Sequence, residues 1–121
     1  MLTPKDVAEE IVNVLDGKKA NDIKLLKTDK LTVLADYFVI CTANSTSHIK
    51  TLSDEVERVL EDQGEAVLRR EGYREGGWVL LDFGCVIVHL FLEETRKFYN
   101  LEHLWSDAQV IDIESVLGAG N

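Results

Sequence analysis

The chain has 121 residues and a formal net charge of −9, with 13 Lys and Arg against 22 Asp and Glu. That length suits one domain with one core, and 45% hydrophobic residues exclude a wholly disordered protein. No apolar stretch reaches the ~18 residues of a membrane span, and the N-terminus lacks the form of a secretion signal, so composition predicts a single-domain, soluble, cytoplasmic protein.

The first elements expected are a helix and a strand. Thr3 and Pro4 make a good helix start, with a hydroxyl cap and a proline in the first turn, and Gly17 closes the helix. Apolar residues at Ile23 and Leu25 alternate with polar ones, and this pattern predicts a strand that extends at most through 31–33.

A second strand and a second helix follow. Residues 35–43 are rich in β-formers and apolar on both faces, which is typical of an inner strand. The polar break at 44–47 offers several N-cap residues. Apolar residues then recur at helical spacing over 49–60, so we predict a helix that ends at Gly64.

The second half of the chain predicts three strands and a last helical segment. Residues 66–70 indicate a short strand. The runs 78–83 and 85–92 are strands so close together that Gly84 has to form a tight turn. Residues 93–105 have the pattern of a helix or of helical turns.

The element count predicts an α/β domain in which a mixed sheet of about five strands carries about three helices. We expect this domain to span 1–105, followed by an acidic C-terminal tail at 106–121, because no Lys or Arg occurs after Lys97. Three modest helices cover one face of a sheet well and the second face only in part. We therefore expect a partner or a second subunit to cover the rest.

Charge and cysteine usage narrow the partners. An excess of acidic residues opposes binding to nucleic acid and favours binding to a basic protein. Cys41 and Cys85 lie in apolar runs, where buried thiols are a better interpretation than a disulfide scaffold or a zinc site. The chain has no phosphate-binding, metalloprotease or serine-hydrolase motif. We expect no cofactor, no metal site and no catalysis.

Candidate contact residues lie on the two long strands and just after them. Trp78 is either core filler or an interface anchor. His89 interrupts an apolar strand, as a satisfied core group or as a partner contact, and a hydrogen bond to Asp82 would satisfy both if they share a face. Arg96 and Tyr99 are types that interfaces favour, although a solvated charge beside a packed tyrosine explains them equally well.

Four motifs occur in one order along the chain. They are Asp-Tyr-Phe-Val at 36–39, the turn with His48, the double strand from Trp78 to His89, and the ending Arg96-x-x-Tyr99-x-Leu101-Glu102-x-x-Trp105. From the first helix to Trp105 the chain thereby resembles the ribosomal silencing factor family (RsfS, also called Iojap). One departure is Cys85, where the family usually has Asp after the turn glycine.

The resemblance implies a translational repressor. Such a protein binds the large ribosomal subunit through its fourteenth protein, sterically blocks joining of the small subunit, and lowers translation when nutrients are scarce. It also implies a nucleotidyltransferase-like topology without catalysis, and homodimers. The predicted partner-binding residues are Trp78, Leu81, Asp82, His89, Phe91, Arg96 and Tyr99.

Two alternatives stay open. One is an assembly factor of the large subunit, which would use the same docked state. The other is a nucleotidyltransferase-like enzyme that binds nucleotide and metal near Asp36 and Ser45. The enzyme is the poorer hypothesis, because the turn at 44–45 has no glycine and Asp36 lacks a nearby second carboxylate to hold a divalent metal.

Overall fold

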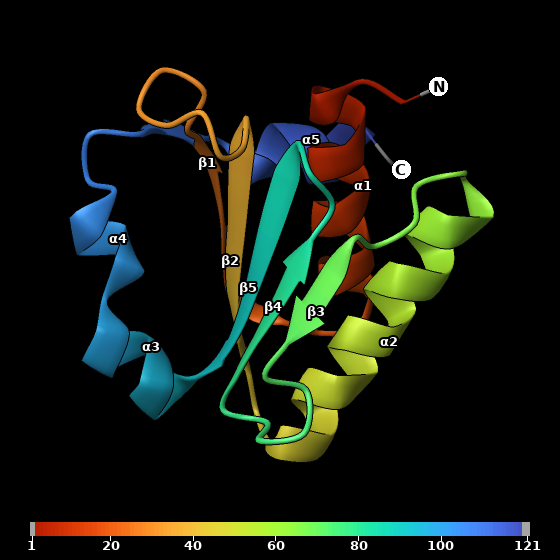
Figure 1. Cartoon of the computed structure of the whole chain (residues 1–121), viewed down its shortest axis with the longest axis vertical. Coiled ribbons are helices and arrows are strands. Elements are labelled where there is room, and N and C mark those ends of the chain that lie inside the picture. Colours follow the sequence, from red (N-terminus) through yellow and green to blue (C-terminus); the bar gives the residue numbers. More distant parts are fainter. Residues whose placement is uncertain (1, 120–121) are drawn as a thin grey trace.

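Six strands and five helices make up residues 2–119, the part of the chain that the computed structural model describes (Figure 1). In chain order they are α1 (Pro4–Gly17), β1 (Asn21–Lys27), β2 (Tyr37–Ala43), α2 (Thr46–Asp62), β3 (Arg69–Glu71), β4 (Trp78–Asp82), β5 (Val86–Leu92), α3 (Glu93–Tyr99), α4 (Leu101–Leu104), β6 (Gln109–Ile111) and α5 (Ile113–Ala119). The predicted α/β class is confirmed, with one strand and two helices more than expected.

One mixed sheet organises the fold, with the strand order β3-β4-β5-β2-β1-β6. β2 and β5 run parallel in its middle, and the other neighbouring pairs are antiparallel. A central strand has both faces buried, which explains why β2 and β5 are apolar on both faces. The short strands β3 and β6 form the two edges.

α1 and α2 cover one face of the sheet side by side (Figure 1). α1 begins with a capping box in which Thr3 and Asp6 bond each other's backbone N–H groups. α2 begins at Ser45, whose hydroxyl accepts from the backbone N–H of His48. Each helix buries one apolar stripe, as the sequence spacing predicts, in a core with the inward residues of the strands.

The turn between β4 and β5 is tight, as expected. Gly84 has φ +85°, a left-handed conformation that favours glycine, and its N–H donates to the carboxylate of Asp82 at 2.8 Å. Both cysteines are free. Cys41 is fully buried, and burial raises the pKa of its thiol to about 12, whereas Cys85 is half-buried.

Two expectations need correction in the irregular parts. The strand β1 ends at Lys27 and does not reach 31–33; residues 28–36 form a loop that Thr28 closes by donating its hydroxyl to the carbonyl of Ala35 at 2.9 Å. The segment after Trp105 is structured through residue 119. Its strand β6 pairs with β1, and its helix α5 packs on α1, so this acidic segment extends the same sheet and core.

Candidate protein-binding surface

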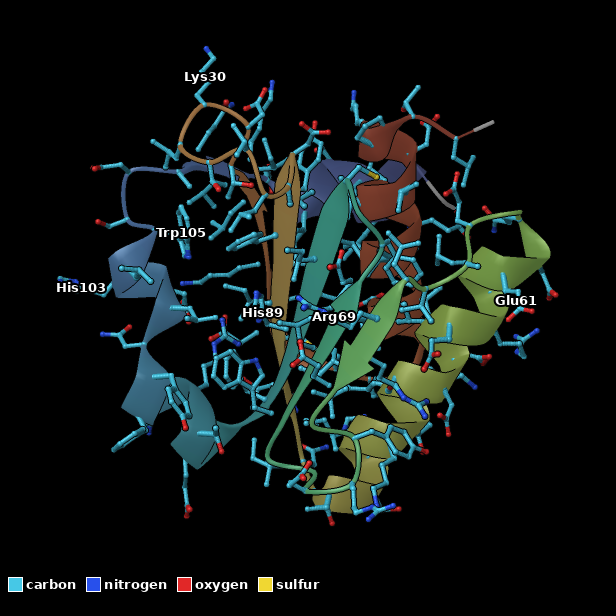
Figure 2. The ribbon with its side chains drawn as sticks, in the orientation of Figure 1. Lys30, Glu61, Arg69, His89, His103 and Trp105 are labelled. Atoms are coloured by element: carbon cyan, nitrogen blue, oxygen red, sulfur yellow. The ribbon has the colours of Figure 1, made fainter. Side chains whose placement is uncertain are left out.

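The second face of the sheet is covered unevenly. Residues 93–108, which include α3 and α4, lie over its central part, while the part formed by β3, β4 and the start of β5 stays partly open (Figures 1 and 2). Residues paired across antiparallel strands point to the same side. The registers of β3, β4 and β5 therefore place six side chains on this part, which we call the open face: Arg69, Glu71, Trp78, Leu80, Asp82 and Ile87.

Rings gather where the open face meets α3 and α4. Trp78 lies 5.0 Å from Phe91, 4.6 Å from Tyr99 and 5.8 Å from His89, between ring centroids. Phe38 on β2 lies 5.2 Å from His89 and 5.1 Å from Trp105 at the end of α4, so it connects Trp105 to these rings. Trp78 is partly exposed and Tyr99 is 51% exposed, so this aromatic cluster presents an apolar surface to solvent.

His89 fixes the indole of Trp78. The indole N–H donates to Nδ1 of His89 at 3.2 Å, which assigns the proton of the neutral imidazole to Nε2. His89 is only 5% exposed, and this burial lowers its pKa to about 4, so the ring is neutral at pH 7. His89 thus positions Trp78 and exposes almost no surface of its own.

The expected hydrogen bond between Asp82 and His89 is not formed. The register pairs His89 with Leu80, while Asp82 lies opposite Ile87, one pair further along the same face. The carboxylate of Asp82 instead accepts from Gly84 and lies 3.7 Å from Nη2 of Arg69. The residue therefore serves the turn and an ion pair on the open face.

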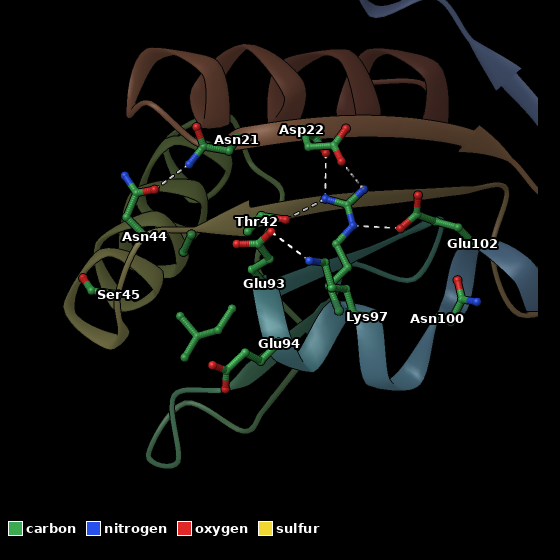
Figure 3. A pocket seen from close by; sticks show the side chains of 13 residues that line it. Asn21, Asp22, Thr42, Asn44, Ser45, Glu93, Glu94, Lys97, Asn100 and Glu102 are labelled. Carbon is green, nitrogen blue, oxygen red and sulfur yellow. Dashed lines mark hydrogen bonds and ion pairs between the residues drawn. The ribbon is translucent and has the colours of Figure 1, made fainter.

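Arg96 is a structural anchor and not the solvated charge considered above. It is 7% exposed and donates to the side chains of Glu102 and Thr42 at 2.7 and 2.8 Å. It also donates to the backbone carbonyl of Asp22 at 2.8 Å (Figure 3). The same hydrogen bond lowers the pKa of Glu102. Because these partners belong to β1, β2 and α4, Arg96 ties α3 and α4 to the sheet and so holds Tyr99 beside Trp78.

Two other predicted contacts are also buried. Leu81 lies on the opposite face of β4, with no exposed area, in the core beneath α1 and α2. Phe91 faces the aromatic cluster but is fully covered. The structure therefore takes Leu81 out of the predicted contact set, because strand alternation turns it away from Trp78.

Trp78, Asp82 and Tyr99 are the predicted contacts that this structure leaves accessible. Leu80 and Ile87 lie beside them on the open face, and the exposed Phe98 packs edge-on against Tyr99. Leu80 and Ile87 are not among the contacts predicted from the sequence. Alternation alone could have found both Leu80 and Ile87. The paired strand β3, which adds Arg69 and Glu71, carries no such signal.

Asp36 and Ser45, the two residues of the enzyme hypothesis, do not lie in one site. Asp36 precedes β2 and Ser45 follows it, so the seven residues of this strand hold the two side chains more than about 20 Å apart. Ser45 is occupied as the cap of α2. Among residues 2–119, no group of three or more His, Cys, Asp and Glu is arranged to hold a metal ion. No helix of the described residues is long and apolar enough to cross a membrane.

Comparison with known proteins gives consistent matches. The sequence profile described as "Ribosomal silencing factor during starvation" matches residues 2–120. A ribosomal silencing factor from Halalkalibacterium halodurans is 36% identical over 116 residues, which are 96% of this chain and 99% of that protein. A crystal structure of a Chromobacterium violaceum protein superimposes with a TM-score of 0.85 at 32% identity, over 87% of this chain and 88% of that one.

A mammalian relative is more distant. The mouse protein named "Mitochondrial assembly of ribosomal large subunit protein 1" is 31% identical over 99 residues, which are 79% of this chain and 43% of that protein. The shared region therefore amounts to most of this chain and less than half of the mouse protein.

Proposed function

The chain belongs to the ribosomal silencing factor family, and from this premise we propose that it binds the large ribosomal subunit through the fourteenth protein of that subunit. The bound factor would occupy the surface on which the small subunit docks. Competition for one surface then represses translation by mass action, without a chemical step. The proposal places the protein wherever ribosomal subunits join, which in a bacterium is the cytoplasm.

The observation that carries this proposal is the open face with Trp78 at its edge. β4 and β5 are apolar on both faces except at Asp82 and His89, and the chain's own helices leave part of one face exposed. The charged residues Arg69 and Glu71 of the edge strand β3 border this apolar part. Aromatic side chains next to a polar rim are typical of binding hot spots. The net charge of −9 adds electrostatic attraction to a basic protein.

Sedimentation through a sucrose gradient with purified ribosomal subunits tests the proposal. We expect the protein to migrate with the large subunit, and the amount of joined ribosomes to fall as its dose rises when small subunits are added last. Trp78→Ala should weaken binding about thirty-fold, because truncating a hot-spot tryptophan costs ~2 kcal/mol. Protein that stays at the top of the gradient would contradict the proposal.

A matched control is Leu34→Ala. Leu34 is also an exposed hydrophobic residue, but it lies in the loop 28–36, beyond the end of the sheet remote from Trp78. Its removal should leave binding unchanged. Circular dichroism checks that Trp78→Ala remains folded; should it unfold, Tyr99→Ala probes the same surface, because Tyr99 is half-exposed and its loss leaves no cavity.

An assembly factor for the large subunit is the second candidate function. The name of the mouse relative favours it. Both functions use the same docked state, so binding alone does not separate them. Migration with the large subunit while the amount of joined ribosomes stays constant would favour assembly.

We also propose that a second copy of the chain competes for the open face. An apolar face that one helix layer leaves uncovered can be buried between two protomers. Light scattering coupled to size-exclusion chromatography measures the mass of the free protein, and of Trp78→Ala beside it. A dimer that Trp78→Ala converts to a monomer is expected. A wild-type monomer at all concentrations would contradict this part of the proposal.

A further inference from the structure

A crevice of about 760 Å³ opens at the carboxyl ends of the two parallel strands (Figure 3). From this end β2 leads into α2 on one side of the sheet, and β5 leads into α3 on the other. In open α/β sheets, ligands bind where adjacent parallel strands diverge in this way. The position thus marks the crevice as a binding site on topological grounds.

The charges that line the crevice favour a cation. Arg96 is neutralised by Glu102 at 2.7 Å and by Asp22 at 3.6 Å, and Lys97 lies 3.2 Å from Glu93. Glu94, which also lines the crevice and is exposed, has no ion pair among residues 2–119. The lining therefore carries four carboxylates and two cations. Glu102 is also paired with Lys24 at 2.8 Å, so Glu94 is the lining carboxylate without a partner cation. Among the described residues, no group of ligands is arranged to hold a metal ion there.

The apolar part of the lining favours a side chain with an apolar stem. Ala43 and Leu92, at the ends of the two strands, contribute apolar surface between the charged groups. Lys and Arg have an apolar stem and a charged tip, so they bury the stem and present the tip to a carboxylate. An anion would meet the excess of carboxylates.

One hydrogen-bond donor in the lining of the crevice lacks an acceptor. Nη2 of the buried Arg96 has no hydrogen-bond partner, although the carboxylate of Asp22 lies 3.6 Å away. The side chain of Asp22 is 66% exposed, so it is free to turn aside. A peptide segment with a basic side chain also brings backbone carbonyls, which are the acceptors that Nη2 lacks.

α3 links the crevice to the open face. Its last residue, Tyr99, touches Trp78, and its second residue, Glu94, lines the crevice. The two residues are five helical positions apart, which is about 8 Å along the axis at 1.5 Å per residue and about 140° around it. A protein that covers Trp78 and Tyr99 can therefore reach the crevice with an extended Lys or Arg side chain.

We propose that this crevice receives a lysine- or arginine-bearing segment of the same basic protein that covers the open face, with Glu94 as the counter-ion. This inference rests on the proposed function for the identity of the partner. The crevice itself can be tested without ribosomes, so the two can fail separately.

The first test is an NMR titration of the full chain with a blocked tri-lysine peptide. We expect saturable shifts at the backbone amides of Asn44, Ser45 and Glu94, with a dissociation constant that Glu94→Gln raises about three-fold or more. Glu61→Gln is the matched control, because Glu61 is exposed on α2, outside the crevice. Equal constants for Glu94→Gln and the wild type, or shifts centred outside the crevice, would overturn the proposal.

The second test measures binding to purified large subunits at two salt concentrations. Glu94→Gln should weaken binding about three- to five-fold at low salt and less than two-fold at high salt, because a partly exposed ion pair is screened. Glu61→Gln should have no effect. If Glu94→Gln binds as tightly as the wild type while Trp78→Ala binds more weakly, the role proposed for the crevice is refuted and the proposed function stands. Absence of wild-type binding would refute the proposed function alone.

Discussion

The two faces of the sheet are built from the same strands but are completed differently. On one face α1 and α2 cover the strands from end to end, and residues such as Leu81 and Val88 are fully buried. On the other face the short helices α3 and α4 leave Trp78 and Leu80 partly exposed. The difference shows that a continuous apolar run in a strand predicts two apolar faces, while the length of the covering helices decides which face is left for a partner.

The two faces also differ in what holds them. The helix-covered face is held mainly by packing of apolar side chains, and polar contacts such as the ion pair between Lys18 and Glu55 lie at its exposed margin. On the other face, hydrogen bonds hold the covering segment and the rings in place. They are the hydrogen bond from Trp78 to His89 and those from Arg96 to β1, β2 and α4. Such hydrogen bonds fix the orientation of the side chains that they join, which suits a surface that has to present particular side chains.

The largest effect that we expect separates neighbouring leucines on the two faces. Leu81→Ala should lower the free energy of unfolding by about 3 kcal/mol, because it leaves a cavity in the covered core. Leu80→Ala should cost about 1 kcal/mol or less, since this side chain already meets solvent. Urea denaturation measures both, and equal losses would show that the two faces are equally packed.

The buried imidazole should make stability depend on pH. The folded-state pKa of His89 is about 4, below its unfolded value of about 6.5. The unfolded chain therefore binds the proton first, and stability falls as the pH is lowered from about 6.5 to about 4. The loss should approach about 3 kcal/mol, at 1.36 kcal/mol per unit.

A variant isolates this contribution from that of the carboxylates. His89→Gln removes the titrating ring, so the fall in stability over the same pH range should be smaller by about that amount. Urea midpoints of both proteins, measured from pH 7 to pH 4, give the difference. Parallel curves for the two proteins would mean that His89 reaches solvent and titrates freely.

Loss of the Arg96 hydrogen bonds should loosen one face and spare the other. Arg96→Ala leaves Thr42 and the carbonyl of Asp22 without this donor, while Glu102 keeps its ion pair with Lys24 at 2.8 Å. The loss should be about 2 kcal/mol, less than for a fully buried pair, because Glu102 is partly exposed. Amide hydrogen exchange should rise in residues 93–105. Faster exchange in α1 as well would show that the two faces unfold together.

The smallest expected effect lies between the two short helices. Asn100 has φ +48°, a left-handed conformation that Asn and Gly tolerate and other residues resist. Asn100→Ala should cost about 1 kcal/mol, and Asn100→Gly close to nothing. Thermal unfolding compares the pair. If Ala is tolerated as well as Gly, the break between α3 and α4 is not fixed by this conformation.

Sequence analysis predicted the regular elements where one principle acts alone. The cap at Thr3, the stripe of α2 and the turn at Gly84 are local signals, and the structure confirms each of them. β6 was missed because a three-residue edge strand has no period to detect, and it exists only because β1 offers an unpaired edge. The strand that was expected to reach 31–33 ends at Lys27, because its pairing with β2 ends there and the chain turns back through the loop 28–36.

The candidate surface was predicted in part. Trp78 was selected for its residue type, and it is partly exposed, as are Asp82 and Tyr99. Arg96 was misjudged because a charge is solvated unless tertiary structure supplies partners, and its acceptors at Asp22 and Thr42 are 74 and 54 residues away in sequence. Nothing local predicts such contacts.

By itself the sequence determined the α/β class, the starts of α1 and α2, the inner strands and the apolar character of those strands on both faces. These follow from periodicity and capping, which act over a few residues. Only the tertiary structure decided that His89 bonds Trp78 and not Asp82, that Leu81 faces the core, and that a crevice opens at the ends of β2 and β5. Register and packing between distant segments set these features, because each depends on which strands become neighbours.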